Sequence, residues 1–149
     1  MKIGNPEKGK IGELAVFGEL LKRGVIPYVP LVDIKGIDAI IRKDDGRLLE
    51  IQVKSTYSKE MQGSFNVDDL VAKSDFFIIG VIGEGDMPEK YEYWVFPSEV
   101  FLKNAQQIPH PDKGYTTYRL DLWYGKRKEG AYLKETLREF CNNWDPLVK

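Results

Sequence analysis

The sequence has few of the residues that build disulfide frameworks or zinc sites. Among its 149 residues there is one cysteine, Cys141, and one histidine, His110. A single cysteine excludes an intramolecular disulfide and is typical of proteins from a reducing compartment. The same scarcity argues against a zinc site and against a Cys–His nucleophilic dyad.

An excess of positive charge and a long apolar run are also lacking. Lys and Arg number 22 against 23 for Asp and Glu, so the formal net charge is −1 and a general basic coat for nucleic acid is excluded. A local basic patch remains compatible with this balance. The longest apolar run, Phe76–Gly83, is far shorter than the ~18 residues of a membrane span. No secretion signal is evident, so we expect a cytoplasmic protein outside the membrane.

The sequence does contain enough apolar residues for one globular domain over residues 1–149. Hydrophobic residues make up 42% and charged residues 30%, as in ordinary soluble domains. Periodicity and turn residues predict, in order, a helix at Asn5–Arg23, an edge strand at Ile26–Val32, a hairpin of Ile37–Arg42 with Arg47–Ser55, a helical turn at Asn66–Leu70, strands at Phe76–Ile82 and Tyr91–Phe96, a helix from Pro97, a loop at Ile108–Gly114, a strand at Tyr115–Leu122 and a terminal helix at Glu129–Asn143. The expected fold class is mixed α/β (α+β), with a central sheet flanked by helices.

Four polar residues on these elements form a candidate catalytic site. Asp38 begins one strand of the hairpin, and Gln52 and Lys54 lie two residues apart on the next strand, so both project from the same face. Hairpin partners lie about 5 Å apart, which brings Asp38 close to that pair. Carboxylate and amide oxygens suit Mg²⁺, and a nearby lysine can orient a water or stabilise phosphate charge. The pattern predicts a site that hydrolyses phosphodiesters.

The same residues resemble a known superfamily of nucleases. Gly36-Ile37-Asp38, followed after 13 residues by Gln52-Val53-Lys54, is similar to the PD-(D/E)xK motif of restriction enzymes and junction resolvases. Glu13, in Gly12-Glu13-Leu14-Ala15, resembles the acid on the first helix of the resolvase-like branches. Gln52 in place of an acid, together with Tyr93–Ser98, resembles a branch that contains small bacterial nucleases and a group I intron homing endonuclease.

The resemblance implies a restriction-endonuclease-like fold and a metal-dependent endonuclease acting on DNA. It implies that Asp38, Gln52 and Glu13 bind Mg²⁺, for which Mn²⁺ could substitute, and that Lys54 positions the attacking water, leaving a 5′-phosphate. No small-molecule cofactor is implied. Because so small a chain reads a long DNA site only by association, we expect a homodimer or homotetramer.

Further DNA contacts and alternative functions stay open at this point. Candidate DNA-binding residues are Lys8, Lys10, Ser55, Lys126, Arg127 and Lys128. Glu50 shares the face of Gln52 and could supply the carboxylate that Gln52 lacks. A catalytically inactive module of the same fold, binding nucleic acid or a partner protein, is the main alternative. An RNA nuclease or a branched-DNA resolvase would use the same site on another substrate.

Overall fold

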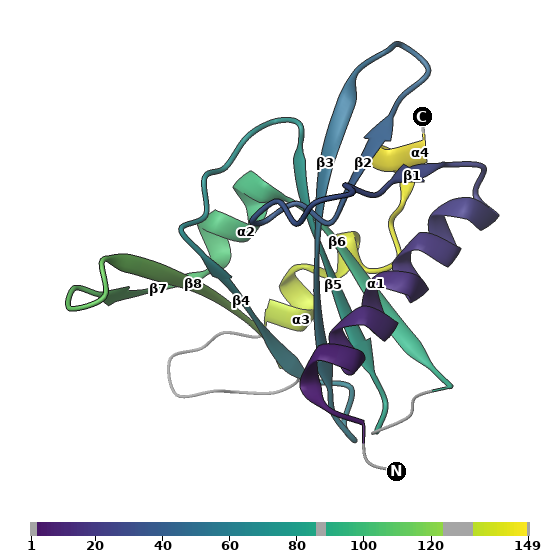
Figure 1. The fold of residues 1–149 in the computed structure, drawn as a ribbon. Coiled ribbons are helices and arrows are strands. Elements are labelled where there is room, and N and C mark those ends of the chain that lie inside the picture. Colours follow the sequence, from purple (N-terminus) through teal and green to yellow (C-terminus); the bar gives the residue numbers. More distant parts are fainter. Residues whose placement is uncertain (1–2, 86–88, 124–132, 149) are drawn as a thin grey trace.

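Two β-sheets form the framework of the computed structural model, which describes residues 3–85, 89–123 and 133–148 (Figure 1). In chain order the elements are α1 (Asn5–Lys22), β1 (Pro27–Tyr28), β2 (Ala39–Arg42), β3 (Leu48–Tyr57), β4 (Gly63–Asp68), β5 (Phe76–Gly83), β6 (Tyr91–Pro97), α2 (Ser98–Asn104), β7 (Gln106–His110), β8 (Tyr115–Leu122), α3 (Leu133–Thr136), the 3-10 helix η1 (Arg138–Phe140) and α4 (Asp145–Val148). The first sheet has the order β1-β2-β3-β5-β6, and the second has the order β4-β8-β7.

The five-stranded sheet is mixed, as expected from the sequence. β2 and β3 form the predicted antiparallel hairpin, and Gly46 in its turn has φ of 88°, a conformation that favours glycine. β3 and β5 run parallel, whereas β5 and β6 are antiparallel. Every residue of β5 is buried, because both faces of this central strand are covered. The fold therefore places β3, which carries Gln52 and Lys54, between β2 and β5.

Helix α1 covers one face of this sheet. Its buried residues Val16 and Leu20 pack in one core cluster with Ile51 and Val53 of β3. In its middle the helix comes very close to β3. A Cβ atom at Gly12 would overlap Oγ of Ser55 and lie 3.0 Å from Cβ of Ser55. Gly12 therefore permits the close approach of helix and strand beside Glu13.

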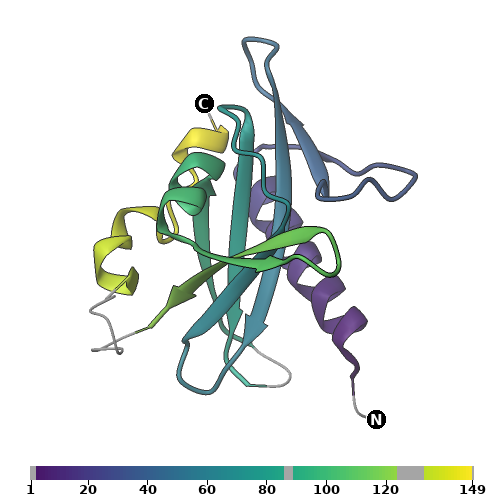
Figure 2. The ribbon, with the colours of Figure 1, turned by 90° about the vertical axis from the view of Figure 1, so that its left-hand side faces the viewer.

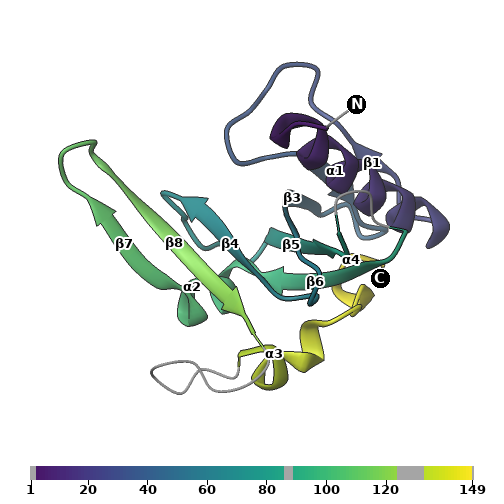
Figure 3. The ribbon, with the colours of Figure 1, turned by 90° about the horizontal axis from the view of Figure 1, so that it is seen from below.

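The second sheet covers part of the opposite face. Phe65 of β4 and Leu120 of β8 belong to a core cluster with Trp94 and Phe96 of β6 and with Phe101 of α2. Figure 3 shows α1 on one side of β5 and β6 and α3 on the other. The strands β7 and β8 project away from this layered body (Figure 1).

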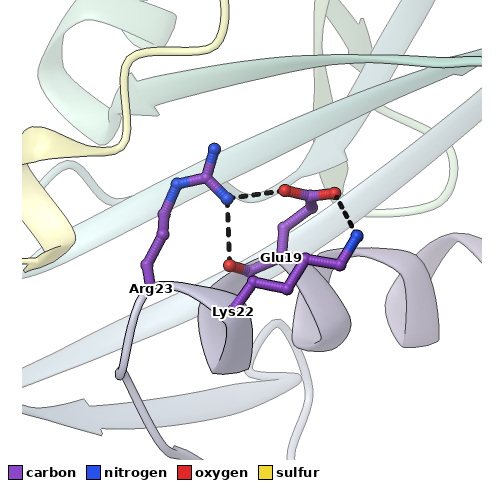
Figure 4. Close-up of polar contacts among 3 residues, drawn as sticks. All are labelled: Glu19, Lys22 and Arg23. Atoms are coloured by element: carbon purple, nitrogen blue, oxygen red, sulfur yellow. Dashed lines mark hydrogen bonds and ion pairs between the residues drawn. The ribbon is translucent and has the colours of Figure 1, made fainter.

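The C-terminal end of α1 is held by a group of charged side chains (Figure 4). Glu19 accepts hydrogen bonds from Lys22 at 3.2 Å and from Arg23 at 2.5 Å. Burial raises the pKa of Glu19, but these two hydrogen bonds outweigh it and lower the pKa overall. The Arg23 guanidinium also lies 4.9 Å from the ring centroid of Trp144. This group joins the helix end to the C-terminal segment.

Some sequence-based expectations are wrong. Residues 66–68 belong to strand β4 instead of a helical turn, and residues 108–110 belong to β7 instead of a loop. The edge strand near residue 27 is only two residues long. Of the terminal helix expected at residues 129–143, residues 129–132 lie outside the described part of the chain, and the rest forms two short helices, α3 and η1, instead of one helix. Of the helices described, none is long and apolar enough to cross a membrane.

Candidate active site

Asp38 lies where strands β2 and β3 separate. The β2–β3 pairing ends at Ala39 opposite Ile51, and the backbone amide of Asp38 donates to the carbonyl of Ile51 at 2.8 Å. Beyond this point β3 continues without β2 beside it. The side chain of Asp38 replaces β2 as the partner of the next backbone amide, because its Oδ2 accepts a hydrogen bond of 2.7 Å from the amide of Val53. The carboxylate is thereby fixed one residue from both Gln52 and Lys54.

Glu13 brings a second carboxylate to Asp38 from helix α1. Burial is the main cause that raises the pKa of Asp38, and the charge and side-chain hydrogen bonding of Glu13 raise it further. The Val53 amide and the charge of Lys54 act in the opposite direction without cancelling the rise. Two acids and a lysine therefore influence one another here, an arrangement frequent at functional sites.

Lys10 accompanies this pair of acids. Its Nζ lies 2.6 Å from Oε2 of Glu13. Hydrogen bonding to Glu13 is the main cause that raises the pKa of Lys10, and the charges of Asp38 and Asp33 add to it. Lys10, Glu13, Asp33 and Asp38 line a hollow with a volume of about 360 Å³, together with apolar residues of the segment before β2.

Gln52 opens toward a second hollow. This hollow has a volume of about 220 Å³ and is lined by Gln52, Glu50, Lys35, Lys73 and others. Ile37 lines both hollows, so it stands between the Asp38 side and the Gln52 side. The Oε1 atom of Gln52 is buried and accepts no hydrogen bond from the described part of the chain. A buried carbonyl oxygen without a donor is costly, unless a ligand or ion satisfies it.

Lys54 and Glu50 share the strand face of Gln52 but differ in their partners. Lys54 acts on Asp38 through its charge, and no described acid lies within ion-pair distance of it. Glu50 has Lys73 at 3.8 Å. Glu50 therefore already has a cationic neighbour in the hollow over Gln52, away from the Glu13–Asp38 pair.

The other predicted DNA-contact residues do not form one cluster with Gln52 and Lys54. Ser55 lies on the face of β3 that α1 covers, opposite Gln52 and Lys54. Lys8 lies one turn before Gly12, where its carbonyl accepts a hydrogen bond from Tyr57 at 2.6 Å and its ammonium lies 5.7 Å from the Tyr57 ring centroid. Lys126, Arg127 and Lys128 lie outside the described residues.

Sequence reasoning missed three contributors to the site. Lys35 and Lys73 bring positive charge to the hollow over Gln52, but neither stands in a recognisable motif. Gly12 sets the distance between α1 and β3, and its position beside Glu13 in the middle of a helix was an available signal.

Comparisons with known proteins add information on the fold. No protein-family model matches the sequence, and no curated protein matches it. The fold is similar to the solved structure of a bacterial homing endonuclease, I-Ssp6803I, with a TM-score of 0.60 and 20% identity over 98% of this chain and 94% of that one. The chain shares the overall fold of that protein. At this identity the likeness concerns the fold, and the expected sheet flanked by helices is confirmed.

Proposed function

We propose that this protein is a metal-dependent endonuclease that hydrolyses DNA phosphodiester bonds. The observation that carries the proposal is the Glu13–Asp38 carboxylate pair, anchored to the Val53 amide next to Lys54 where β2 and β3 separate. The fold it shares with a homing endonuclease agrees with this function. The spacing of Asp38, Gln52 and Lys54 supports membership of the PD-(D/E)xK superfamily and of the branch with Gln in place of an acid.

The donor atoms fit a hard divalent cation. In the proposal Asp38 and Glu13 supply carboxylate oxygens from their hollow. Gln52 supplies its buried Oε1 atom, which has no donor among the described residues, from the adjoining hollow on the other side of Ile37. The described residues hold no group of three or more His, Cys, Asp and Glu side chains suited to a metal, so waters and the substrate phosphate must complete the shell. When bound, Mg²⁺ or Mn²⁺ would act as a Lewis acid on the scissile phosphate.

The protein's own groups then have separate tasks. The Val53 amide holds the carboxylate of Asp38 in one orientation. Lys54, which has no ion-pair partner among the described residues, positions the attacking water and stabilises charge on the phosphate. The water loses a proton to solvent as it adds to phosphorus, and the bond from phosphorus to the 3′ oxygen breaks. That oxygen takes up a proton from solvent, so the products are a 5′-phosphate and a 3′-hydroxyl. DNA is the proposed substrate, and cutting both strands requires two such sites in a homodimer or homotetramer.

Cleavage of supercoiled plasmid, linear duplex and four-way junction, each with Mg²⁺ or EDTA, tests the proposal. We expect metal-dependent cutting that Lys54→Ala abolishes while its melting temperature stays close to that of the wild type. Lys103→Ala, an exposed lysine on α2, is the matched control and should cut normally. If the protein cuts only RNA, or only four-way junctions, then duplex DNA is not its substrate and the proposed substrate would have to be replaced.

Metal binding distinguishes the enzyme from an inactive module. Calorimetry with Mn²⁺ in the presence of DNA should show binding by the wild type that weakens in Asp38→Ala. If no substrate is cut and no metal binds, the enzyme hypothesis is wrong and a catalytically inactive module of this fold is favoured.

A further inference from the structure

The second sheet presents a polar face on the side that points away from the core. Along β4, Phe65 and Val67 are buried, whereas Asn66 and Asp68 are exposed. Because residues directly opposite each other in a sheet share a face, the register extends this face to β8 and β7. We refer to it as the outer face of the second sheet. It comprises Ser64, Asn66 and Asp68 of β4, Tyr115, Thr117, Arg119 and Asp121 of β8, and Gln106, Ile108 and His110 of β7.

A row of three hydrogen-bonding side chains crosses the outer face. Asn66 of β4 and Gln106 of β7 both pair with Arg119 of β8, which lies between them. Neighbouring strands are about 4.8 Å apart, so the row spans about 10 Å. Asn and Gln are the side chains that bind the edge of adenine through two hydrogen bonds, and Arg binds the edge of guanine in the same way. The row therefore has the chemistry of base readout.

Arg119 is held in a fixed orientation by two neighbours on the same face. Its Nε donates to Oδ1 of Asp121 at 2.9 Å, and its Nη2 donates to Oγ of Ser64 at 3.2 Å. A guanidinium has five N–H donors, so within the described part of the chain these two bonds leave three for a ligand. The side chain is 38% exposed. A donor group that is oriented in advance loses little conformational freedom on binding.

The charge of the outer face fits base edges better than the phosphate backbone. Its charged residues are one arginine and two aspartates, Arg119, Asp68 and Asp121, whereas a phosphate-binding surface needs an excess of cations. Base edges in the major groove offer donors and acceptors, and an aspartate can accept from cytosine. The groove is about 12 Å wide and admits a two-stranded ribbon. Figure 2 shows such a ribbon, the green β7–β8 hairpin, nearest the viewer and in front of the first sheet.

The outer face begins at the rim of the hollow over Gln52. Asp68 lines that hollow, and its Oδ1 accepts a hydrogen bond of 2.7 Å from Oγ1 of Thr117. Asn66 follows two residues away along β4, a distance of about 7 Å. Lys35 and Lys73 line the same hollow with side chains that are 85% and 52% exposed, and they bring positive charge for phosphates. A duplex cut at the candidate site would therefore have bases near the cut within reach of the row.

We propose that the outer face of the second sheet reads DNA sequence in the major groove, an inference that rests on the proposed function. Arg119 donates two hydrogen bonds to O6 and N7 of a guanine, and Asn66 and Gln106 each bind N6 and N7 of an adenine. At about 3.4 Å per base pair, the row covers about three base pairs. Double-stranded RNA is not read in this way, because side chains cannot enter its major groove.

Selection from a pool of random-sequence DNA duplexes tests the inference with the full-length protein, with Ca²⁺ in place of Mg²⁺ so that bound DNA stays intact. We expect the wild type to enrich a sequence whose guanine preference falls by about 5- to 150-fold in Arg119→Ala. Arg119→Lys should lose the same preference, since lysine keeps the charge but lacks the planar fork. Gln106→Ala should lose an adenine preference. Gln107→Ala is the matched control, because Gln107 is the next exposed residue of β7 and points to the opposite face.

The salt dependence of binding to the enriched duplex separates base readout from phosphate contact. A residue that binds no phosphate leaves the slope of log affinity against log salt unchanged, so Arg119→Ala should keep the wild-type slope. A slope reduced by about one, with the sequence preference intact, would assign Arg119 to the phosphate backbone and overturn the inference. Enrichment of no sequence by the wild type would also overturn it, as would the same enriched sequence in Arg119→Lys and Gln106→Ala.

The outcomes for the outer face are independent of those for the nuclease. A base preference that the face variants lose would support the inference even if no metal led to cleavage. Cutting that depends on Lys54, together with an unchanged preference in the face variants, would support the nuclease and overturn the inference. Because Gln106 is exposed and Arg119→Lys keeps the charge beside Asp121, the melting temperatures of Gln106→Ala and Arg119→Lys should stay close to that of the wild type.

Discussion

Replacing Gly12 by alanine should show how closely α1 must approach β3 for Glu13 to reach Asp38. An alanine in a helix interior is favoured over glycine by about 1 kcal/mol. At position 12 the new Cβ would overlap Oγ of Ser55 and lie 3.0 Å from its Cβ. Overpacking of this kind costs roughly 1–3 kcal/mol. The net expectation is a loss of roughly 0–2 kcal/mol in the free energy of unfolding.

Gly9→Ala is the matched control in the same helix. Nothing lies within 4 Å of its new Cβ, so this substitution should stabilise the protein by about 1 kcal/mol. The two variants should therefore differ by roughly 1–3 kcal/mol in urea unfolding, and by several degrees in melting temperature at about 2–4 °C per kcal/mol. Adding Ser55→Ala to Gly12→Ala should recover part of the loss, because it removes the overlapping oxygen.

The activity of the same variants completes the test. Displacement of α1 moves Glu13 away from Asp38, so Gly12→Ala should lower kcat in the proposed reaction while Gly9→Ala should not. If Gly12→Ala is as stable and as active as Gly9→Ala, the close approach of helix and strand does not limit the geometry of the site. The role that we assign to Gly12 would then be wrong.

Three further substitutions have expected outcomes. Asp38→Asn should be more stable than the wild type at pH 7, because the pKa of Asp38 is raised in the folded state above its unfolded value. In urea unfolding, this gain in stability should shrink as the pH falls through the folded pKa. It should vanish below the unfolded pKa of about 3.9. Lys134 is buried and lies 2.9 Å from Glu92, so Lys134→Ala should lower the free energy of unfolding by roughly 3–5 kcal/mol, with Lys134→Met/Glu92→Gln closer to the wild type. Gly80→Ala should destabilise by roughly 1–3 kcal/mol in thermal unfolding, since its Cβ would lie 2.5 Å from the Phe65 ring, and Phe65→Leu should relieve part of this loss.

The parts of the fold that were predicted correctly have local causes. The β2–β3 hairpin follows from its turn residues and from alternation along β3, and β5 follows from its apolar run. The wrong expectations depend on distant partners. Asn66 pairs with Arg119 in the second sheet, and this pairing outweighs the local preference for a turn. The C-terminal helix is broken because Asn142 adopts φ of 52° and donates to the carbonyl of Tyr93, which draws the chain onto β6.

In the candidate site, too, the features set by local sequence were predicted and those set by distant contacts were not. Spacing alone predicts that Asp38 lies near Gln52 and Lys54, because a hairpin fixes the register between its strands. The position of Glu13 depends on the packing of α1 at Gly12, and the separation of the two hollows by Ile37 depends on the path of the segment before β2. Neither of these can be read from periodicity, because both arise from contacts between elements.

The raised pKa of Asp38 and the buried oxygen of Gln52 both indicate that this region was not selected for stability alone. Two carboxylates held together in a half-buried place oppose folding, and so does a buried amide oxygen that no described residue donates to. A divalent cation would remove both penalties, since it favours the ionised form of Asp38 and can satisfy Gln52 Oε1. Metal binding should therefore raise the melting temperature of the wild type more than that of Asp38→Asn, a difference that needs no cleavage assay to detect. An equal rise in both proteins would show that the cation binds elsewhere.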